Sequence, residues 1–180
     1  MTSYDEVLDY WFVETEPKAW WTVDPAFDGR IRERFGALHA RAALGELYPW
    51  RTTPKGRLAE VIVLDQFSRN LFRGSAQAFA QDLAALVLAQ EAVAAGAHRG
   101  LEPERRAFLL LPYMHSESSE VHVVAEQLFR EFTPAANHDF ELRHKAIVDR
   151  FGRYPHRNAA LGRTSTPEER EFLGQPGSSF

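Results

Sequence analysis

Residues 57–72 read RLAEVIVLDQFSRNLF, and this stretch combines the periodicity of a helix with charge in an unusual place. When the residues are projected at about 100° per residue, an apolar face forms with Asp65 and Arg69 at its centre. Three further apolar residues form a second face, namely Leu64, Phe67 and Leu71. Because apolar side chains lie on two faces, the stretch predicts a helix that is buried on most of its sides.

Start and stop signals for helices recur on both sides of this stretch. Thr53 followed by Pro54 is a helix start, because threonine caps the first turn and proline fits the first helical position. Glycine and proline mark most of the helix ends, and Pro112 in particular is expected to break a helix. The expected helices cover residues 4–14, 25–44, 54–72, 76–95, 103–111, 113–132, 137–151 and 167–173.

The overall pattern indicates a single all-α domain. No segment shows the sustained alternation of a β-strand. We therefore predict an all-α fold over residues 1–175, a single globular array of about seven to nine antiparallel helices joined by short connections. Residues 176–180 are expected to form a loose C-terminal tail.

Composition excludes several classes of protein. The 180 residues carry a formal net charge of -4 and no cysteine. Without a basic excess the chain is not expected to bind nucleic acid, and without cysteine it has no disulfide, thiolate nucleophile or Cys-ligated zinc. Its apolar runs are shorter than the roughly 20 residues of a membrane helix, and its N-terminus MTSYDEVLDYWFVE lacks the basic start of a secretion signal. We expect a soluble, cytoplasmic protein that does not associate with membranes.

The charges on the face of 57–72 need partners. Asp65 and Arg69 are four residues apart, so they can pair directly along the helix. An unpaired buried charge is very costly, which makes some partner necessary. Two interpretations stay open at this point: a purely structural ion pair in the core, or part of a functional site.

Further polar residues fall on apolar faces of later helices. Glu117 lies on the apolar face predicted for 113–132, with His115 and His122 along its edge. His144 falls in the inner stripe of 137–151, beside Phe140. An inward histidine is often a satisfied core residue. If these faces converge with that of 57–72, they form one cluster of acid, base and guanidinium, and such clusters favour shifted pKa values and functional sites.

A cationic turn follows the helix predicted over residues 137–151. Residues 151–163 read FGRYPHRNAALGR; Gly152 is expected to end the preceding helix, and Pro155 to fix a turn. The turn presents polar groups close together, namely Arg153, His156, Arg157 and Asn158. They suit a carboxylate or phosphate ligand. The alternative is that the arginines cap helix ends or pair with internal acids such as Asp65 and Glu117.

Several strings resemble one bacterial family. DQFSRN at 65–70, LPYMHSES at 111–118 and FGRYPHRN at 151–158 resemble the domain-of-unknown-function family 924, over nearly the whole chain. The resemblance implies an all-helical, tetratricopeptide-like arrangement of helix pairs, and it implies no reaction. The motif residues that it implies are Asp65, Gln66, Arg69, Asn70, Arg73, His115, Glu117, Arg153, His156, Arg157 and Asn158.

Two functions are compatible with these observations. In the first, a pocket binds a small anionic metabolite. The most specific version of this hypothesis is that the protein also hydrolyses or transfers that metabolite. His156 or His144 would act as acid or base, and Asp65 or Glu117 would orient it. The candidate ligand-binding residues are Arg69, Asn70, Arg73, His115, Arg153, Arg157 and Asn158. In the second function, tetratricopeptide-like helix pairs bind an acidic peptide or partner without catalysis.

The sequence predicts neither a cofactor nor a metal. Phosphate-binding and dinucleotide-binding glycine loops are absent from the sequence. The spacing of His115, Glu117 and His122, H-x-E-x4-H, matches no established metal signature, and His144 adds no regular spacing. The sequence does not decide whether the protein is an enzyme or which oligomeric state it adopts.

Overall fold

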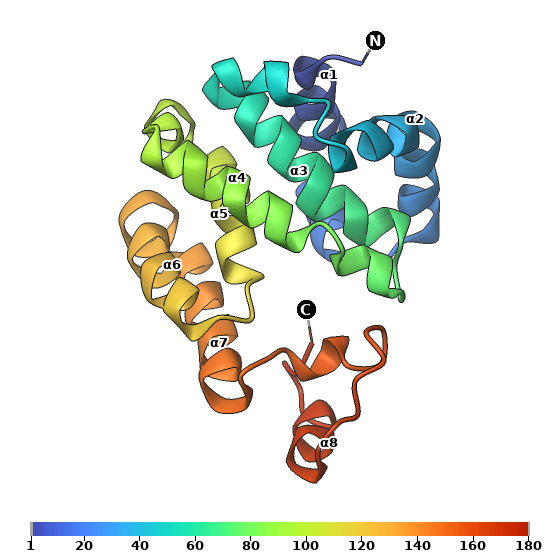
Figure 1. Ribbon diagram of the computed structural model, residues 1–180, viewed down its shortest axis with the longest axis vertical. Helices are drawn as coiled ribbons and strands as arrows, with labels where there is room; N and C mark the ends of the chain where they lie inside the picture. The colour runs from blue at the N-terminus through green and yellow to red at the C-terminus, as the bar shows by residue number, and fades with distance from the viewer. Residues whose placement is uncertain (1, 180) are drawn as a thin grey trace.

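Eight α-helices make up the fold of residues 2–179, the part of the chain that the computed structural model describes, and this range contains no strand (Figure 1). The all-α prediction is therefore confirmed. The helices are α1 (Tyr4–Asp9), α2 (Pro25–Ala43), α3 (Pro54–Leu71), α4 (Asp82–Ala94), α5 (Pro103–Met114), α6 (Ser119–Phe132), α7 (Ala135–Phe151) and α8 (Pro167–Leu173).

Helix caps form where the sequence signals them. The Thr53 side chain accepts a hydrogen bond from the backbone N–H of Gly56 and caps α3. Thr166 and Glu169 form a reciprocal capping box at the start of α8. Gly152 ends α7 with a positive φ of 68°, a conformation that glycine adopts without steric cost.

Helix α3 is the centre of the fold. Of its 18 residues, 14 are buried, as the two apolar faces of its sequence predict. It packs against α1, α2, α4 and α5. Consecutive helices also pair as α2 with α3, α4 with α5, and α6 with α7, which is the predicted tetratricopeptide-like arrangement (Figure 1).

A cluster of aromatic rings fills the space between α1, α2, α3 and α5. Trp11 is almost completely buried, and its ring meets the edges of Phe67 and Phe108 at 5.6 and 5.8 Å between centroids. Phe35 from α2 lies 5.0 Å from Phe67. Edge-to-face contacts of this kind add to the free energy gained by burying the rings.

The predicted break at Pro112 is wrong. Helix α5 continues through Pro112 to Met114, and the N–H of His115 still donates to the carbonyl of Leu111 at 2.9 Å. Proline removes one helical hydrogen bond, but its φ is compatible with a helix. Burial of Pro112, Tyr113 and Met114 offsets the lost bond. The helix expected to begin at 113 therefore begins only at Ser119.

The helices expected over 4–14 and 76–95 are each interrupted. A π-helical turn, Tyr10–Glu14, follows α1. A 3-10 turn, Ala76–Phe79, precedes α4, and the carbonyl of Ala78 accepts a hydrogen bond from the guanidinium of Arg69. A tertiary contact from α3 therefore takes the place of the next helical hydrogen bond.

The C-terminal part forms a smaller cluster of its own. Ile147, Val148 and Tyr154 pack together with Phe151 and Phe172, and this joins α7 to α8 at one end of the molecule (Figure 1). Phe140, expected in the inner stripe of α7, is instead half-exposed.

The C-terminal tail contacts the end of α8. In the tail, Ser178 is buried and donates to the carbonyl of Leu173; residue 180 lies outside the described residues. None of the helices in residues 2–179 combines the length and apolar content needed to cross a lipid bilayer.

The aromatic cluster predicts a large difference between two tryptophans. Trp11→Ala removes a side chain that is 1% exposed and should lower the free energy of unfolding by about 3–5 kcal/mol. Trp21→Ala is the matched control, because the Trp21 side chain is 64% exposed and should cost much less. Urea denaturation of both variants measures the difference; equal losses would contradict the central role of the cluster.

Candidate functional site

A buried carboxylate and a histidine form the core of the candidate site. Asp65 on α3 is 0% exposed, and its Oδ1 lies 2.7 Å from Nδ1 of His115 at the C-terminal end of α5. The Gln66 amide donates to the other carboxylate oxygen at 2.6 Å. Burial raises the pKa of the Asp65 carboxyl, but the charge and hydrogen bond of His115, together with Arg69, outweigh burial and bring it to about 2. Asp65 is therefore ionised at neutral pH.

Arg69 pairs mainly with a residue that the sequence analysis did not identify. Its guanidinium forms two hydrogen bonds to the carboxylate of Asp82, at 2.7 and 2.9 Å, and approaches Asp65 only to 4.0 Å. The predicted pair along α3 is present, but as the longer of the two contacts. Because Asp82 begins α4, this double hydrogen bond ties α4 to α3.

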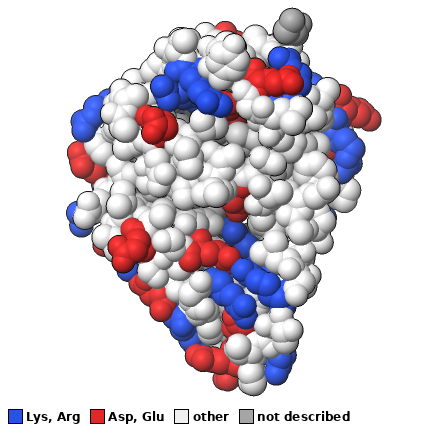
Figure 2. Space-filling view, viewed as in Figure 1, with Lys and Arg blue, Asp and Glu red and all other residues white. Residues whose placement is uncertain are grey.

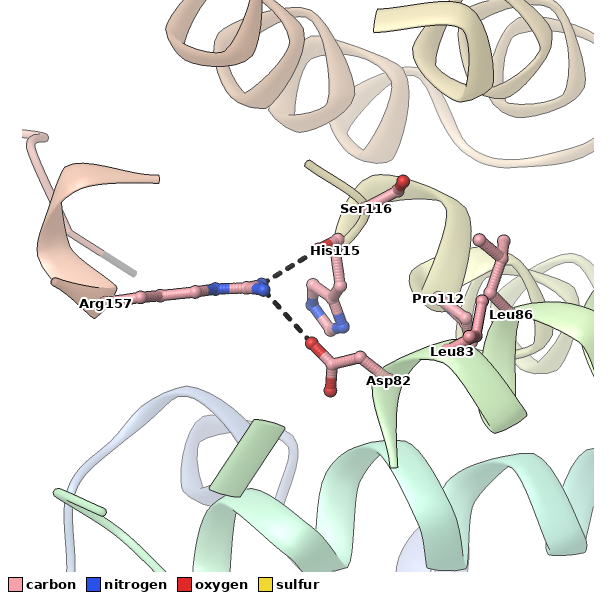
Figure 3. Close-up of a pocket in the computed structure, with 7 residues that line it drawn as sticks. All are labelled: Asp82, Leu83, Leu86, Pro112, His115, Ser116 and Arg157. Carbon is pink, nitrogen blue, oxygen red and sulfur yellow. Dashed lines mark hydrogen bonds and ion pairs between the residues drawn. The ribbon is translucent and has the colours of Figure 1, made fainter. Parts of the chain in front are cut away.

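Arg157 reaches the same carboxylate from the cationic turn. It donates to Asp82 at 3.1 Å and to the backbone carbonyl of His115 at 2.9 Å (Figure 3). The ring of Phe79 lies 4.7 Å from the guanidinium of Arg157 and 4.7 Å from that of Arg69. The structure therefore brings together side chains from α3, the end of α5 and the turn after Gly152, whereas the cluster considered in the sequence analysis drew on the faces of 57–72, 113–132 and 137–151.

Arg157 has no carboxylate of its own, because it shares Asp82 with Arg69. Burial lowers the pKa of its guanidinium; Asp82 opposes this effect, and the neighbouring charge of Arg69 adds to it. Its Nε is buried and has no hydrogen-bond partner among the described residues. A buried guanidinium that shares one carboxylate with a second guanidinium attracts additional negative charge.

A pocket of about 140 Å³ opens beside these groups. Seven residues line it, namely Asp82, Leu83, Leu86, Pro112, His115, Ser116 and Arg157 (Figure 3). Since Asp65 engages Nδ1 of His115, Nε2 is the ring nitrogen left for a molecule in the pocket. The pocket therefore presents an oriented imidazole and a buried guanidinium to one space.

A second polar network holds the loop after α5 in place. The hydroxyl of Tyr154 donates to the carbonyl of Met114 at 2.6 Å, and the backbone N–H of Tyr154 donates to Glu117 at 2.7 Å. His122 is fully buried between Glu141, at 2.6 Å, and the carbonyl of Ser116, at 2.9 Å. This network fixes the backbone from which His115 projects.

The structure changes the interpretation of two residues in this region. His122, expected along the edge of an apolar face, is fully buried between Glu141 of α7 and the carbonyl of Ser116. Glu117 does not lie on a helix face, because α6 begins after it, at Ser119. Glu117 instead receives two hydrogen bonds from Arg163, at 2.7 and 2.9 Å.

The other arginines and amides of the motifs make structural contacts. Arg153 forms two hydrogen bonds to Glu169 of α8, at 2.7 and 2.9 Å, and Asn158 contacts the same carboxylate. Asn70 and Arg73 both donate to Asp28 of α2, at 2.8–2.9 Å. None of these four residues lines the pocket, so the structure separates them from His115 and Arg157.

The two histidines named as acid–base candidates lie behind the pocket wall. His144 contacts the carbonyl of Phe140 through Nδ1, at 2.8 Å, and the edge of the Tyr154 ring. Burial lowers the pKa of His144 to about 3 and that of His156 to about 4; for His156 the charge of Arg157 adds to the effect of burial. Neither side chain lines the pocket, and Asp65 orients His115 in their place.

Sequence reasoning missed Asp82, Phe79 and Tyr154. Asp82 stands at the first position of α4, where an acid is also explained by the helix dipole. Phe79 and Tyr154 are aromatic residues in turns, for which the sequence indicates no partner. The proximity of Asp82 to two arginines could be found only from the packing of α4 against α3.

Comparisons with known proteins place the chain among uncharacterised relatives. A family model described as a bacterial protein of unknown function (DUF924) matches residues 7–177. No curated protein matches the chain. The solved structure of a protein of unknown function, ATU0120 from Agrobacterium tumefaciens, is 38% identical over 94% of this chain and 96% of that one, with a TM-score of 0.88.

Removal of Arg69 should strongly destabilise the fold. Arg69→Ala leaves the carboxylate of Asp82 without its double hydrogen bond and weakens the compensation of Asp65, so we expect a loss of about 3 kcal/mol in unfolding free energy. Arg34→Ala is the matched control, because Arg34 and Glu14 form an exposed pair of similar geometry. Denaturant melts in which both variants lose equally little would refute the pairing.

The lowered pKa of Asp65 predicts a specific loss of stability in acid. Its folded pKa, about 2, lies below the ordinary value of 3.8, so the ionised carboxylate stabilises the fold fully above pH 3.8. This contribution, about 2 kcal/mol, is lost as the pH falls through about 2. The Asp65→Asn variant has no carboxylate at this position, so its unfolding free energy does not include this pH-dependent contribution. Urea melts of both proteins between about pH 5 and about pH 2 should therefore converge; a constant difference would contradict the assignment.

Proposed function

We propose a function for this chain, which belongs to the bacterial protein family of unknown function DUF924: it binds a small anion between His115 and Arg157, and the Asp65–His115 pair is the acid–base group of that site. The observation that carries this proposal is the hydrogen bond from the imidazole of His115 to the buried carboxylate of Asp65 at the wall of a pocket that also holds Arg157.

Anion binding follows from the balance of charge at the pocket. Arg69 and Arg157 share the carboxylate of Asp82, and burial makes the charge of Arg157 costly. An anion in the pocket lies close to both Arg157 and the free edge of His115 (Figure 3). A charge-assisted hydrogen bond to each of them stabilises the bound anion.

Acid–base chemistry follows from the orientation of His115. A buried carboxylate on Nδ1 holds the imidazole in one tautomer and one orientation, so Nε2 can give or take a proton. Tyr154 and His122 keep the loop of His115 rigid. An activated water is the simplest nucleophile for such a site, which makes hydrolysis or transfer on an anionic metabolite the reaction class we propose.

The second function, a peptide-interaction module, rests on the helix-pair architecture alone. That architecture is compatible with peptide binding. It does not account for the pairing of His115 with a buried carboxylate at a pocket. Peptide binding therefore stays a prediction, and the anion site is the proposal we develop.

Acetate provides the simplest test of the anion site. Titration calorimetry should detect saturable binding of acetate to the wild-type protein. His115→Gln retains a donor to Asp65 but lacks the imidazole, and Arg157→Lys retains the charge but loses the fork of hydrogen bonds. Each variant should weaken acetate binding by about tenfold or more, because a hydrogen bond to a charged group contributes roughly 1.5–3 kcal/mol.

The control for this titration is Arg34→Ala, which removes an arginine from an exposed ion pair outside the pocket lining. It should bind acetate as the wild type does. Absence of saturable binding by the wild type, or binding that is equal in all four proteins, would contradict the proposed site.

A further inference from the structure

The pocket has two chemically different sides. Arg157, Asp82 and the ring of His115 lie on one side, and Leu83, Leu86 and Pro112 lie on the other (Figure 3). A simple inorganic anion would contact only the polar side. The apolar side therefore indicates that part of the ligand is apolar.

The apolar side continues onto the surface of α4. Leu83 at the pocket is 73% exposed, and Val87 is 47% exposed one turn further along the same face of the helix. Figure 2 shows that the middle of this face of the molecule, where α4 runs in Figure 1, carries few charged residues, whereas charges gather toward both ends. An apolar strip thus begins at the pocket and follows α4.

The volume of the pocket limits what it can enclose. At about 140 Å³ it is smaller than the roughly 300–1,000 Å³ of sites that enclose a whole drug-sized ligand. A head group of a few atoms fills it. Any longer part of the ligand must leave the pocket, and the strip of Leu83 and Val87 is the apolar surface at its edge.

The charges at the pocket select a monoanion. Two guanidinium groups, Arg69 and Arg157, are balanced by two carboxylates, Asp65 and Asp82. Because these four charges cancel, every negative charge on a ligand lies beside two carboxylates, and one charge is repelled less than two. A dianion would leave excess negative charge beside two carboxylates.

We propose that the ligand is a carboxylic acid with an unbranched apolar chain. Its carboxylate lies between His115 and Arg157, and its chain follows Leu83 and Val87 along α4. This inference rests on the proposed anion site and adds the class of ligand. It also explains why apolar residues of α4 are exposed at the edge of a charged pocket.

A series of straight-chain carboxylates tests the chain. Acetate, butyrate, hexanoate and octanoate are titrated by calorimetry, each below the concentration at which it forms micelles. Full burial of a methylene group corresponds to about fourfold in affinity. Because Leu83 and Val87 offer an open surface, we expect about twofold tighter binding for each added methylene group. Hexyl phosphate, a dianion at high pH, should bind more weakly than hexanoate.

Two variants locate the chain on α4. Leu83→Gln combined with Val87→Gln keeps good helix formers at exposed positions, so the fold should be retained. In this variant the gain with chain length, measured as the ratio of octanoate affinity to acetate affinity, should disappear. The matched control is Leu44→Gln, because Leu44 is an exposed leucine that does not line the pocket.

The outcomes separate this inference from the proposed function. If acetate binds but longer chains bind no tighter, the apolar-chain inference is overturned while the anion site stands. If the gain with chain length persists in the α4 double variant, the chain lies elsewhere and the inference is overturned. If no carboxylate binds at all, both proposals fail. Loss of the gain in the double variant alone supports the inference.

Discussion

The burial of one carboxylate constrains most of this structure. Asp65 projects from a helix that is enclosed on nearly all sides, and an ionised group there needs opposite charge and hydrogen bonds within reach. Gln66 donates at 2.6 Å, His115 lies at 2.7 Å, and Arg69 approaches to 4.0 Å. The end of α5 must therefore lie beside the middle of α3, which explains why α5 passes through Pro112 and stops only where His115 can turn toward Asp65.

The arginines of the cationic turn, residues 151–163, pair with other carboxylates around the site. These arginines do not form a single cluster. Arg157 enters the site through Asp82, whereas Arg163 neutralises Glu117 and Arg153 neutralises Glu169. Most of the charge in the turn thus anchors the C-terminal segment to the helices. Among these arginines only Arg157, which shares the carboxylate of Asp82 with Arg69, lies at the pocket. This shared carboxylate is the basis for proposing an anion there.

The proposed site draws on residues that also hold the fold together. The pair of Asp65 and His115 holds α3 to α5, and it also orients an imidazole toward a pocket. Buried charged pairs contribute little net stability compared with apolar packing. Their presence in the best-packed helix of the fold is therefore better explained by the chemistry they make available than by the stability they provide.

The sequence by itself determined the all-α class, the caps of α3 and α8 and the burial of α3, because periodicity and capping are local properties of neighbouring residues. It also identified Asp65 and Arg69 as inward-pointing charges and Arg157 as part of a cationic turn. It did not determine where α5 ends and α6 begins, because packing carries α5 through Pro112. Only the tertiary structure decided the partners: Asp82 for both arginines, and His115 in place of His144 or His156 beside Asp65. Charges pair across helices according to packing distances, and no repeat along a single helix records those distances.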